Sequence, residues 1–427
     1  MLPVKQAESI ILDSVQSLDP ELDTEVAELS SATGRILASS VTSQLDFPHW
    51  DNSAMDGYAV RYIDVQFCHS QQPAILDIVA EIPAGYQPQV SIQSGEAARI
   101  FTGGVMPEGA DTVVMQEDTK REENRVFIFQ SPKPQACVRH RASFYHAGEP
   151  LLNPGIVLNA PEIAILAAAQ CTELTVYRRP KVAILSTGDE LVTPDQPLQP
   201  GQIVDSNQYA LAAWVRLCGG IPKVRGIVGD NPEKLKNAIA EAILAADIVL
   251  STGGVSVGDY DYVDRILAEL GAEIHIHSVA IKPGKPLTFA TLPPSLTASS
   301  IQGHKQRSHH PVLYFGIPGN PVSALVSCWR FVQPALRKLS GLPPELWEPM
   351  FVNAIAIQDL HGDGRKECYL SGRLRLVKGG YEFELAGGSH SSGNLINLAQ
   401  TTGLAVVPVG QTFIPAGESV QVLIVDS

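Results

Sequence analysis

Acidic side chains gather where apolar runs end between residues 189 and 261. They are Asp189, Glu190, Asp205, Asp230, Asp259 and Asp261. Several carboxylates in one place can hold a hydrated Mg²⁺, which binds one or two of them and takes its other ligands from water and phosphate oxygens. Asp230 stands before Asn-Pro-Glu, so a helix cap is the favoured interpretation when it is taken alone. For Asp259 and Asp261, capping and metal binding are equally supported.

Glycine-containing loops follow three of these apolar runs, in the segments VAILSTGDEL, DIVLSTGGVSVGDYD and YFGIPGNPVSAL. Glycine lets a ligand touch the backbone, and free N–H groups at the start of a helix attract anions. For any single loop a plain turn is the favoured explanation, but three loops together predict a phosphate site. Its candidate residues are Thr187, Gly188, Thr252, Gly253, Gly254, Ser256, Pro318, Gly319, Asn320 and Pro321.

Two lysines flank a Pro-Gly turn in the segment IKPGKPL. Lys282 and Lys285 stand three residues apart, and the prolines keep the loop stiff. Surface lysines are usually solvated. Here a strand-like segment enters the loop and another leaves it, so we expect the two ammonium groups to bind an oxyanion.

The elements that must position these residues alternate between strand and helix from about 180 to 338. Continuous apolar strands between amphipathic helices predict a doubly wound parallel sheet with helices on both faces. In such a sheet, ligands bind beyond the carboxyl ends of the strands, where the three loops would share one crevice. No loop has the G-x-x-x-x-G-K-[ST] or G-x-G-x-x-G pattern, which argues against P-loop hydrolysis and dinucleotide binding.

The flanking regions follow other patterns. Helical spacing at the N-terminus and at 29–41, and a helix at 160–170 with Pro161 in its first turn, predict a helical linker domain made of 1–44 and 141–178. Strands broken by Gly and Pro predict a β-rich second domain at 45–140 and a C-terminal β-barrel at 339–427, which flank an α/β domain at 179–338. The polar stretch 292–311 contains His304, His309 and His310, and a solvated loop is favoured over a metal site.

Composition restricts the class of protein. The 427 residues allow about three domains of usual size, and 44% hydrophobic with 18% charged residues is typical of a soluble protein. No segment approaches the ~20 apolar residues of a membrane helix, so we expect a cytoplasmic protein. A formal charge of −14 argues against a nucleic-acid partner. Six cysteines are scattered singly, which indicates neither a zinc site nor a disulfide framework.

A second group of polar residues lies far earlier in the chain. DNSAMDGYAV contains Asp56, and RIFTGGVMPEGADTVVMQED contains Thr102. A turn-and-hairpin explanation covers both segments, so taken alone they do not predict chemistry.

Six ordered motifs nevertheless resemble those of one known family. DNSAMDGYAV, IFTGGVMPEGADTVVMQED, LSTGDEL, STGGVSVGDYDYV, IKPGKPL and GIPGNPVSAL are similar, nearly word for word, to motifs of the molybdopterin molybdenumtransferases, the MoeA and gephyrin E-domain family. The resemblance covers essentially the whole chain. It implies an elongated homodimer of four-domain subunits, with each active site between the α/β domain of one subunit and the second domain of the other.

The resemblance also implies a reaction. Molybdopterin adenylate, the product of a molybdopterin adenylyltransferase, is hydrolysed with Mg²⁺, AMP leaves, and molybdenum from molybdate enters the dithiolene. The chain has no cysteine cluster, so the dithiolene sulfurs must capture the metal. By motif matching, the family's catalytic positions are Asp56, Thr102, Glu190, Asp230, Asp259 and Asp261. Of these, Asp56, Glu190 and Asp259 are the implied Mg²⁺ ligands. Lys282 and Lys285 are assigned to molybdate or phosphate, and the glycine-containing loops together with Ser392 to the substrate.

Two segments depart from the family pattern. VRHRASFYHAGEPLL has Ala142, Ser143 and Phe144 where the family has Gly-Glu-Asp, so two carboxylates are missing. Ser392 and Gly393 stand in the reverse order of the family's Gly-Ser turn. The first change keeps open a gephyrin-like scaffold with weakened catalysis as the alternative function, although the other acids and lysines are present. A second alternative, the adenylylating enzyme, needs only the α/β domain.

Overall fold

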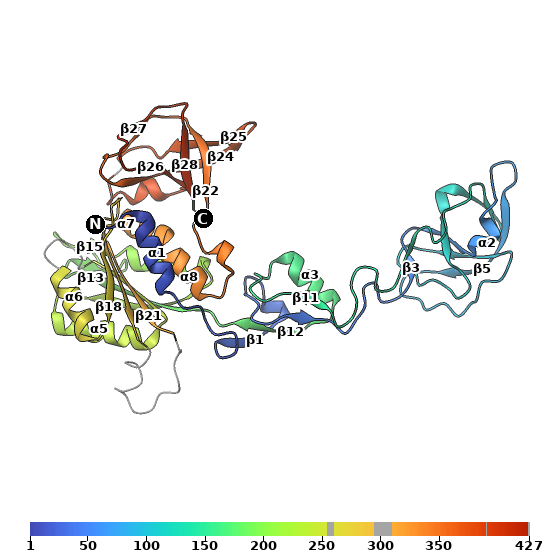
Figure 1. The fold of residues 1–427 in the computed structure, drawn as a ribbon, viewed down its shortest axis with the longest axis horizontal. Coiled ribbons are helices and arrows are strands. Elements are labelled where there is room, and N and C mark those ends of the chain that lie inside the picture. The colour runs from blue at the N-terminus through green and yellow to red at the C-terminus, as the bar shows by residue number, and fades with distance from the viewer. Residues whose placement is uncertain (254–259, 294–309, 390, 426–427) are drawn as a thin grey trace. The chain divides into compact units, whose positions relative to one another are not determined.

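The computed structural model describes residues 1–253, 260–293, 310–389 and 391–425 (Figure 1). It contains two compact units, and each is described by itself. The first consists of Met1–Ser39, Pro154–Asn159 and Glu173–Ser427, and the second of Ser40–Asn153 and Ala160–Thr172. In the described parts of both units, no helix combines the length and the apolar character needed to span a membrane.

The first unit contains a six-stranded sheet whose carboxyl ends carry the predicted loops. In spatial order the strands are β16 (Ile221–Val228), β13 (Lys181–Thr187), β17 (Ile248–Thr252), β21 (Val312–Ile317), β20 (Pro286–Leu292) and β18 (Glu273–Ser278). β16, β13, β17 and β21 pair in parallel, whereas β20 is antiparallel to both of its neighbours. The predicted α/β sheet is therefore confirmed, with one reversed strand.

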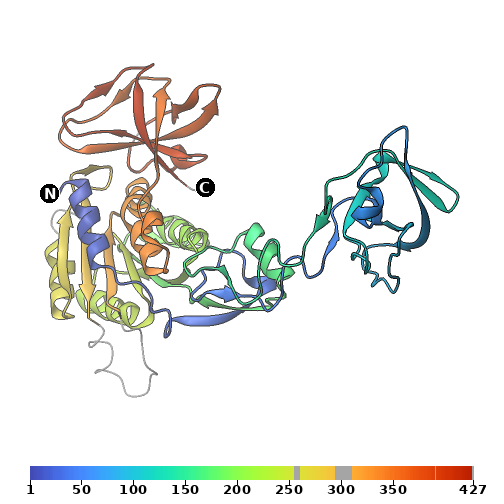
Figure 2. The same ribbon diagram turned by 45° about the vertical axis from the view of Figure 1, so that its right-hand side comes forward.

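Helices cover both faces of this sheet, because successive strand residues point to opposite sides. Val182 and Ile184 of β13 pack in one core with α1, α4, α7 and α8, and Ala183 and Leu185 pack in another with α5 and α6 (Figure 2). The helices are α1 (Val4–Ser14), α4 (Asn207–Leu217), α5 (Pro232–Ala245), α6 (Tyr260–Glu269), α7 (Pro321–Ser327) and α8 (Gln333–Leu339). Both faces are thus closed to water, and the strand ends remain the place for a ligand.

The N-terminal segment differs in part from its prediction. The predicted first helix exists as α1, but it packs beside α8 in the core of the first unit and not with the helix at 160–170. The predicted helix at 29–41 is wrong. Only Leu29–Ser31 forms a short 3₁₀ turn, Gly34 takes a positive φ of 74°, and Ile36 and Leu37 then bridge to Val157 and Val176. The chain after Gly34 is therefore extended, and its apolar side chains face two different neighbouring segments. The positive φ of Gly34 ends the 3₁₀ turn and begins this extended segment.

The C-terminal part of the first unit is a closed five-stranded barrel, as predicted. Going around it, the strands are β24 (Glu367–Val377), β25 (Gly380–Leu385), β22 (Phe351–Ala356), β28 (Ser419–Ile424) and β26 (Gly403–Val407), and β26 pairs again with β24. Two further short strands, β23 (Leu360–His361) and β27 (Phe413–Ile414), pair with each other. β19 (Ile281–Lys282) adds to β24, with Lys282 opposite Cys368, so the lysine loop is attached to the barrel. Two-stranded pairs of β1 (Thr24–Glu28) with β12 (Glu173–Tyr177) and of β14 (Leu191–Val192) with β15 (Ile203–Val204) complete this unit.

The second unit is β-rich. Its sheet has the order β7 (Thr112–Met115), β4 (Gly57–Val60), β6 (Glu96–Ile100), β5 (Ala74–Ile82), β9 (Arg125–Ile128) and β8 (Thr119–Glu122). β3 (Asn52–Ser53) pairs with β10 (Val138–Arg139), and β2 (Val41–Thr42) with β11 (Pro150–Leu152). Two helices, α2 (Tyr62–Val65) and α3 (Ala160–Ala168), belong to it, and α3 is the helix predicted at 160–170. The turn before β4 carries Asp56.

Candidate active site

A crevice of about 1080 Å³ lies beyond the carboxyl ends of β13, β17 and β21. Eleven of the predicted loop and acidic residues line it, so the structure brings them into one place. They are Thr187, Gly188, Glu190, Asp205, Asp230, Thr252, Gly253, Pro318, Gly319, Asn320 and Pro321. Parallel strands end at one edge of the sheet, and this geometry collects loops that are far apart in the sequence.

Two glycines allow the chain to close around this crevice. Gly253 has a φ of 85°, and a Cβ on it would lie 2.3 Å from the carbonyl oxygen of Thr187. A Cβ on Gly188 would lie 2.5 Å from a carboxylate oxygen of Glu190, so that carboxylate is folded over bare backbone. A larger residue at Gly253 would push the backbone of the two loops apart, whereas one at Gly188 would displace the Glu190 carboxylate.

The N-cap of α5 is Asn231 and not Asp230. Asn231 caps α5, because its Oδ1 accepts a hydrogen bond from the Lys234 N–H at 3.0 Å. The prediction that Asp230 serves as the cap is therefore wrong. Instead, the backbone N–H of Asp230 donates to Asp189 Oδ1 at 3.1 Å, and that of Asp189 donates to Asp230 Oδ2 at 3.4 Å. This exchange leaves the Asp230 carboxylate at the crevice wall.

A buried amide that was not among the predicted residues joins two of the loops. Asn207, 7% exposed at the start of α4, donates from Nδ2 to the Gly319 carbonyl at 2.7 Å and to Thr252 Oγ1 at 3.1 Å. Thr187 Oγ1 donates to the Thr252 carbonyl at 3.2 Å. The three loop ends are thereby fixed to one another. The sequence offered only an Asn at the start of a predicted helix as a signal, which is equally typical of a helix cap.

A second cavity of about 680 Å³ adjoins the crevice and shares Pro286, Pro318 and Asn320 with it. Lys282, Lys285 and Lys366 line it, with His361 and Asp363. Burial would raise the pKa of Asp363, but the N–H groups of Lys366 and Arg365 and the charge of Lys282 hold that pKa below its usual value. The surplus of cations makes this lysine pocket suitable for a small oxyanion.

Ser392 lies where the lysine pocket meets α7. Its Oγ accepts a hydrogen bond from Asn320 Nδ2 at 3.0 Å, and its carbonyl accepts one from the Val322 N–H at 3.1 Å. The predicted residue thus belongs to the wall of this pocket in spite of its reversed order with Gly393.

A hydrogen-bonded network holds the barrel strand that forms the back of the lysine pocket. Arg330, 2% exposed in a π-helical turn at Cys328–Val332, donates to both carboxylate oxygens of Glu8 at 2.6 and 2.8 Å and to the hydroxyl of Tyr369 at 2.9 Å. Tyr369 itself lines the lysine pocket and donates to Glu367. Arg330 thus links Glu8 of α1 to Tyr369 of β24 through hydrogen bonds that are largely shielded from water.

In the second unit, Asp56 and Thr102 are direct partners. Asp56 Oδ1 accepts hydrogen bonds from the Thr102 N–H at 2.8 Å and from Thr102 Oγ1 at 2.7 Å. These two bonds lower the pKa of Asp56, so its carboxylate is ionised at neutral pH. The DNSAMDGYAV motif and the RIFTGGVMPEGADTVVMQED motif are therefore in direct contact, through the hydrogen bonds between Asp56 and Thr102.

The departure at Ala142, Ser143 and Phe144 falls in a loop held by two other acids. Asp51 Oδ1 accepts from the Arg141 N–H at 2.7 Å, and Asp46 Oδ2 accepts from Arg141 Nε at 2.6 Å. Ala142 has a φ of 60°, and Phe144 is 72% exposed. Two carboxylates, those of Asp46 and Asp51, therefore still lie beside this loop, although both come from an earlier segment of the chain.

Some predicted residues are not placed. Gly254, Ser256, Asp259, His304 and His309 lie outside the described residues, and Asp261 is placed only as part of α6. The prediction of a solvated loop is wrong for His310. That ring is 2% exposed, with Nε2 3.3 Å from an Arg178 nitrogen and 3.4 Å from Asp247 Oδ1, because this buried ion pair offers it polar partners.

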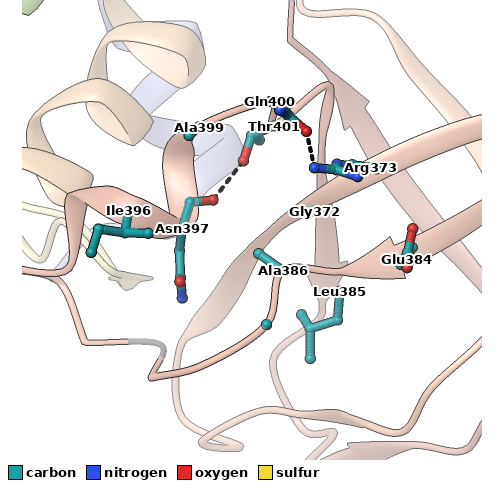
Figure 3. A pocket seen from close by; sticks show the side chains of 11 residues that line it. Gly372, Arg373, Glu384, Leu385, Ala386, Ile396, Asn397, Ala399, Gln400 and Thr401 are labelled. Atoms are coloured by element: carbon teal, nitrogen blue, oxygen red, sulfur yellow. Dashed lines mark hydrogen bonds between the residues drawn. The ribbon is translucent and has the colours of Figure 1, made fainter.

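A further cavity, of about 310 Å³, lies on the barrel (Figure 3). It shares Leu385 and Asn397 with the lysine pocket. Several of its polar side chains have partners within the barrel, in the lining or next to it. Arg373 donates to Gln400, Glu384 pairs with Arg375, and Asn397 donates to the Ser389 carbonyl at 2.7 Å. None of the predicted site residues lines this cavity, so the crevice and the lysine pocket remain the candidate site.

No group of three or more His, Cys, Asp or Glu side chains with metal-binding arrangement occurs in the parts of the chain that the structure describes.

Three family descriptions match successive parts of the chain. They are the MoeA N-terminal region (domain I and II) at residues 2–169, the probable molybdopterin binding domain at 183–338, and the MoeA C-terminal region (domain IV) at 353–425. A molybdopterin molybdenumtransferase of Nostoc sp. is 60% identical over 423 residues, which cover 99% of this chain and 94% of that protein. The protein of the same name from Haemophilus influenzae is 36% identical over 84% of this chain and 83% of its own length.

A solved structure has the same fold over the full chain. The molybdopterin biosynthesis MoeA protein of Pyrococcus horikoshii OT3 matches with a TM-score of 0.81 and 26% identity, covering 100% of both chains. Relatives in sequence and in structure thus span both units, the crevice and the lysine pocket alike. We conclude that this chain belongs to the molybdopterin molybdenumtransferase (MoeA) family.

Proposed function

We propose that this protein inserts molybdenum from molybdate into adenylylated molybdopterin, with Mg²⁺-dependent hydrolysis of the adenylate and release of AMP. The observation that carries the proposal is the adjoining pair of cavities, one lined by acids and bare backbone and the other by lysines. The two halves of the reaction need these two environments. A phosphoanhydride must be bound and hydrolysed, and a tetrahedral oxyanion must be held next to it.

In this proposal the crevice takes the phosphate-bearing part of the substrate. Backbone at Gly188, Gly253 and Gly319 permits close approach of a charged ligand, and the rigid link through Asn207 keeps the loops in one arrangement before binding. The lysine pocket takes molybdate, and the two sulfurs of the pterin bind the metal, because Cys368 is a single thiol in the lining whose pKa is raised by burial.

Mg²⁺ fits the crevice by the chemistry of its donors. Glu190 and Asp230 line it, and Asp205 Oδ2 is buried there without a hydrogen-bond partner among the described residues. Hard oxygen donors suit Mg²⁺, which needs only one or two carboxylates beside water and phosphate. One or two of Glu190, Asp230 and Asp205 would hold the ion beside water and substrate oxygens, and when bound it would neutralise phosphate charge during hydrolysis. Of the other residues that the resemblance assigns to Mg²⁺, Asp56 lies in the second unit and Asp259 lies outside the described residues.

The proposal includes a cytoplasmic homodimer in which Asp56 and Thr102 of one subunit complete the crevice of the other. A molybdopterin adenylyltransferase would supply the substrate. The scaffold alternative is not favoured, because Glu190, Asp230 and the lysines are all in place at the two cavities.

The test is an AMP-release assay with purified protein, molybdopterin adenylate, molybdate and Mg²⁺, followed by reconstitution of an apo-molybdoenzyme. We expect AMP release and active cofactor. Glu190→Gln should abolish most AMP release, whereas Glu418→Gln, an exposed matched change on the barrel, should not. If the wild-type protein releases no AMP at any divalent-ion concentration, the scaffold function is the better description.

A further inference from the structure

One segment of the barrel lines both the crevice and the lysine pocket. Residues 391–397, which we call the partition, run between β25 and β26. The crevice is lined by Gly393 and Leu395 of this segment, and the lysine pocket by Ser391, Ser392 and Asn397. The partition is therefore in contact with both places in which the proposed reaction needs a ligand.

Two asparagines fold the partition back onto a single carbonyl group. Asn397 is 9% exposed, and its Nδ2 donates to the Ser389 carbonyl oxygen at 2.7 Å. Asn394 Nδ2 donates to the same oxygen at 2.8 Å and to Asn397 Oδ1 at 3.2 Å. The Asn397 carbonyl in turn accepts from Thr401 Oγ1 at 2.9 Å, which ties it to the chain that enters β26 (Figure 3). These four hydrogen bonds close the partition into a loop before any ligand is bound.

Ser392 attaches the partition to the start of α7. Its Oγ accepts from Asn320 Nδ2 at 3.0 Å, and its carbonyl accepts from the Val322 N–H at 3.1 Å. A serine hydroxyl can also donate one hydrogen bond, and that of Ser392 has no acceptor among the described residues. Because Lys282 and Lys285 line the same pocket, this hydroxyl can donate to an oxyanion that the two ammonium groups hold.

We propose that Asn397 is a positioning residue for the oxyanion of the lysine pocket. Its amide is engaged at both ends, by Ser389 and by Asn394, so it acts on the anion through the placement of Ser392. A loop that is ordered before binding loses less entropy when the ligand arrives, and it keeps the hydroxyl in one place. The inference rests on the proposed function, since it takes molybdate as the ligand of this pocket.

Calorimetric titration of the full-length protein tests this, with molybdate as the probe of the lysine pocket and AMP as the probe of the crevice. Asn397→Leu keeps the approximate size of the side chain and removes its hydrogen bonds. We expect molybdate affinity to fall roughly five- to tenfold, as for the loss of one hydrogen bond. AMP affinity should stay nearly unchanged, because Asn207 fixes the crevice loops separately. Asn353→Leu, an exposed change on β22 of the same barrel, should alter neither affinity.

A double change distinguishes positioning from a general weakening of the barrel. If Asn397 acts through Ser392, then Asn397→Leu combined with Ser392→Ala should bind molybdate about as weakly as Ser392→Ala alone. Losses that add in the double variant, equal losses of molybdate and AMP affinity, or an Asn397→Leu variant with wild-type affinity would each overturn the proposal. If the wild-type protein itself binds no molybdate, the assignment of the lysine pocket in the proposed function fails, and this inference fails with it.

Discussion

At the scale of single residues, Asp56 is a carboxylate held by two hydrogen bonds from one partner, Thr102. Asp56→Asn keeps an oxygen that accepts from Thr102 and removes only the charge. If that charge acts in the transition state, turnover should fall by about 10²-fold while pterin binding changes little. Single-turnover AMP release and a binding titration measure the two quantities. Asp77→Asn, in an exposed pair with Arg125 of the same unit, is the control. Equal losses of binding and turnover would assign Asp56 to binding instead.

Asn207 makes a different residue-scale prediction, because its side-chain amide fixes two loops of the crevice to each other. Asn207→Ala leaves the Gly319 carbonyl and Thr252 without their donor, and one unpaired buried group costs about 1–3 kcal/mol. We expect a lower free energy of unfolding and a higher KM for the pterin substrate, with kcat less affected. Denaturant titration and steady-state kinetics check this, against exposed Asn353→Ala as the control. A normal KM in the folded variant would remove Asn207 from the site.

At this scale, the sequence could predict site residues that are close together along the chain, but not contacts between residues that are far apart along it. The acids and glycines of each loop were visible as motifs, because each stands next to its own strand. The partners of Asn207 are 45 and 112 residues away, and only tertiary structure brings them together. Asp230 and Asn231 are adjacent, and both residue types are common helix caps. Cap propensity therefore could not tell which of the two precedes the first turn of α5. His310 was assigned to a polar loop, because its buried partners Arg178 and Asp247 are also distant.

At the scale of elements, one buried ion cluster ties the starts of two sheet strands to the N-terminal segment. Arg178 donates to Asp23 and with both Nη groups to Asp247, which also accepts from the Lys181 N–H at 2.7 Å. Burial would raise the pKa of Asp247, but bonds from His310 and Arg178 hold it well below its usual value. The folded state therefore binds a proton to Asp247 less readily than the unfolded state does.

The sign of the pH effect follows. A lowered carboxylate pKa stabilises the fold fully above the unfolded value near 3.9, and this contribution is lost as the pH falls towards the folded value. Asp247→Asn should lower the free energy of unfolding by about 3 kcal/mol at neutral pH, because Arg178 stays buried with one anion fewer. The difference from wild type should shrink below about pH 4. Urea titrations at several pH values test this, with exposed Asp13→Asn as the control. A difference that is constant with pH would contradict it.

A second cluster joins α1, the π-helical turn and the barrel through Arg330, Glu8 and Tyr369. Glu8→Gln leaves a buried guanidinium without its anion, so the free energy of unfolding should fall by about 3 kcal/mol. The double change Glu8→Leu with Arg330→Met removes both charges and should cost clearly less than the single change. Denaturant titrations of both variants decide this. Equal costs would mean that packing of α1, and not the ion pair, carries the stabilisation.

Elements were predictable where their periodicity was strong. The continuous apolar runs of β13, β17 and β21 predicted the central sheet, because strands buried on both faces have that pattern. Periodicity carries no direction, so the reversal of β20 could not be predicted. Residues 29–41 show the opposite failure. Their apolar spacing fits a helix, but Gly34 and long-range bridges to Val157 and Val176 impose an extended path.

At the scale of the whole molecule, the chain separates its predicted chemistry between two compact units. Glu190, Asp230 and the lysines belong to the first, and Asp56 and Thr102 belong to the second. The boundaries of the four domains stay predictions, because the structure separates the chain into two compact units. The dimer stays a prediction because the structure contains one chain. Family membership, in contrast, was predictable from six motifs, since each is local in sequence and specific in composition.

Sharing of active sites between subunits can be tested by complementation. Asp56→Asn damages the second unit, and Glu190→Gln damages the crevice of the first. If one active site takes its second unit from the partner subunit, a mixed dimer contains one intact site and one doubly damaged site. Two inactive variants, refolded together in equal amounts, should then recover about a quarter of wild-type AMP release, because half of the dimers are mixed and half of their sites are intact. Mixing Asp56→Asn with Thr102→Val should give no recovery, since both changes fall in the same unit. If instead each chain completes its own site, every mixed dimer carries two damaged sites, and the first mixture will stay as inactive as its components.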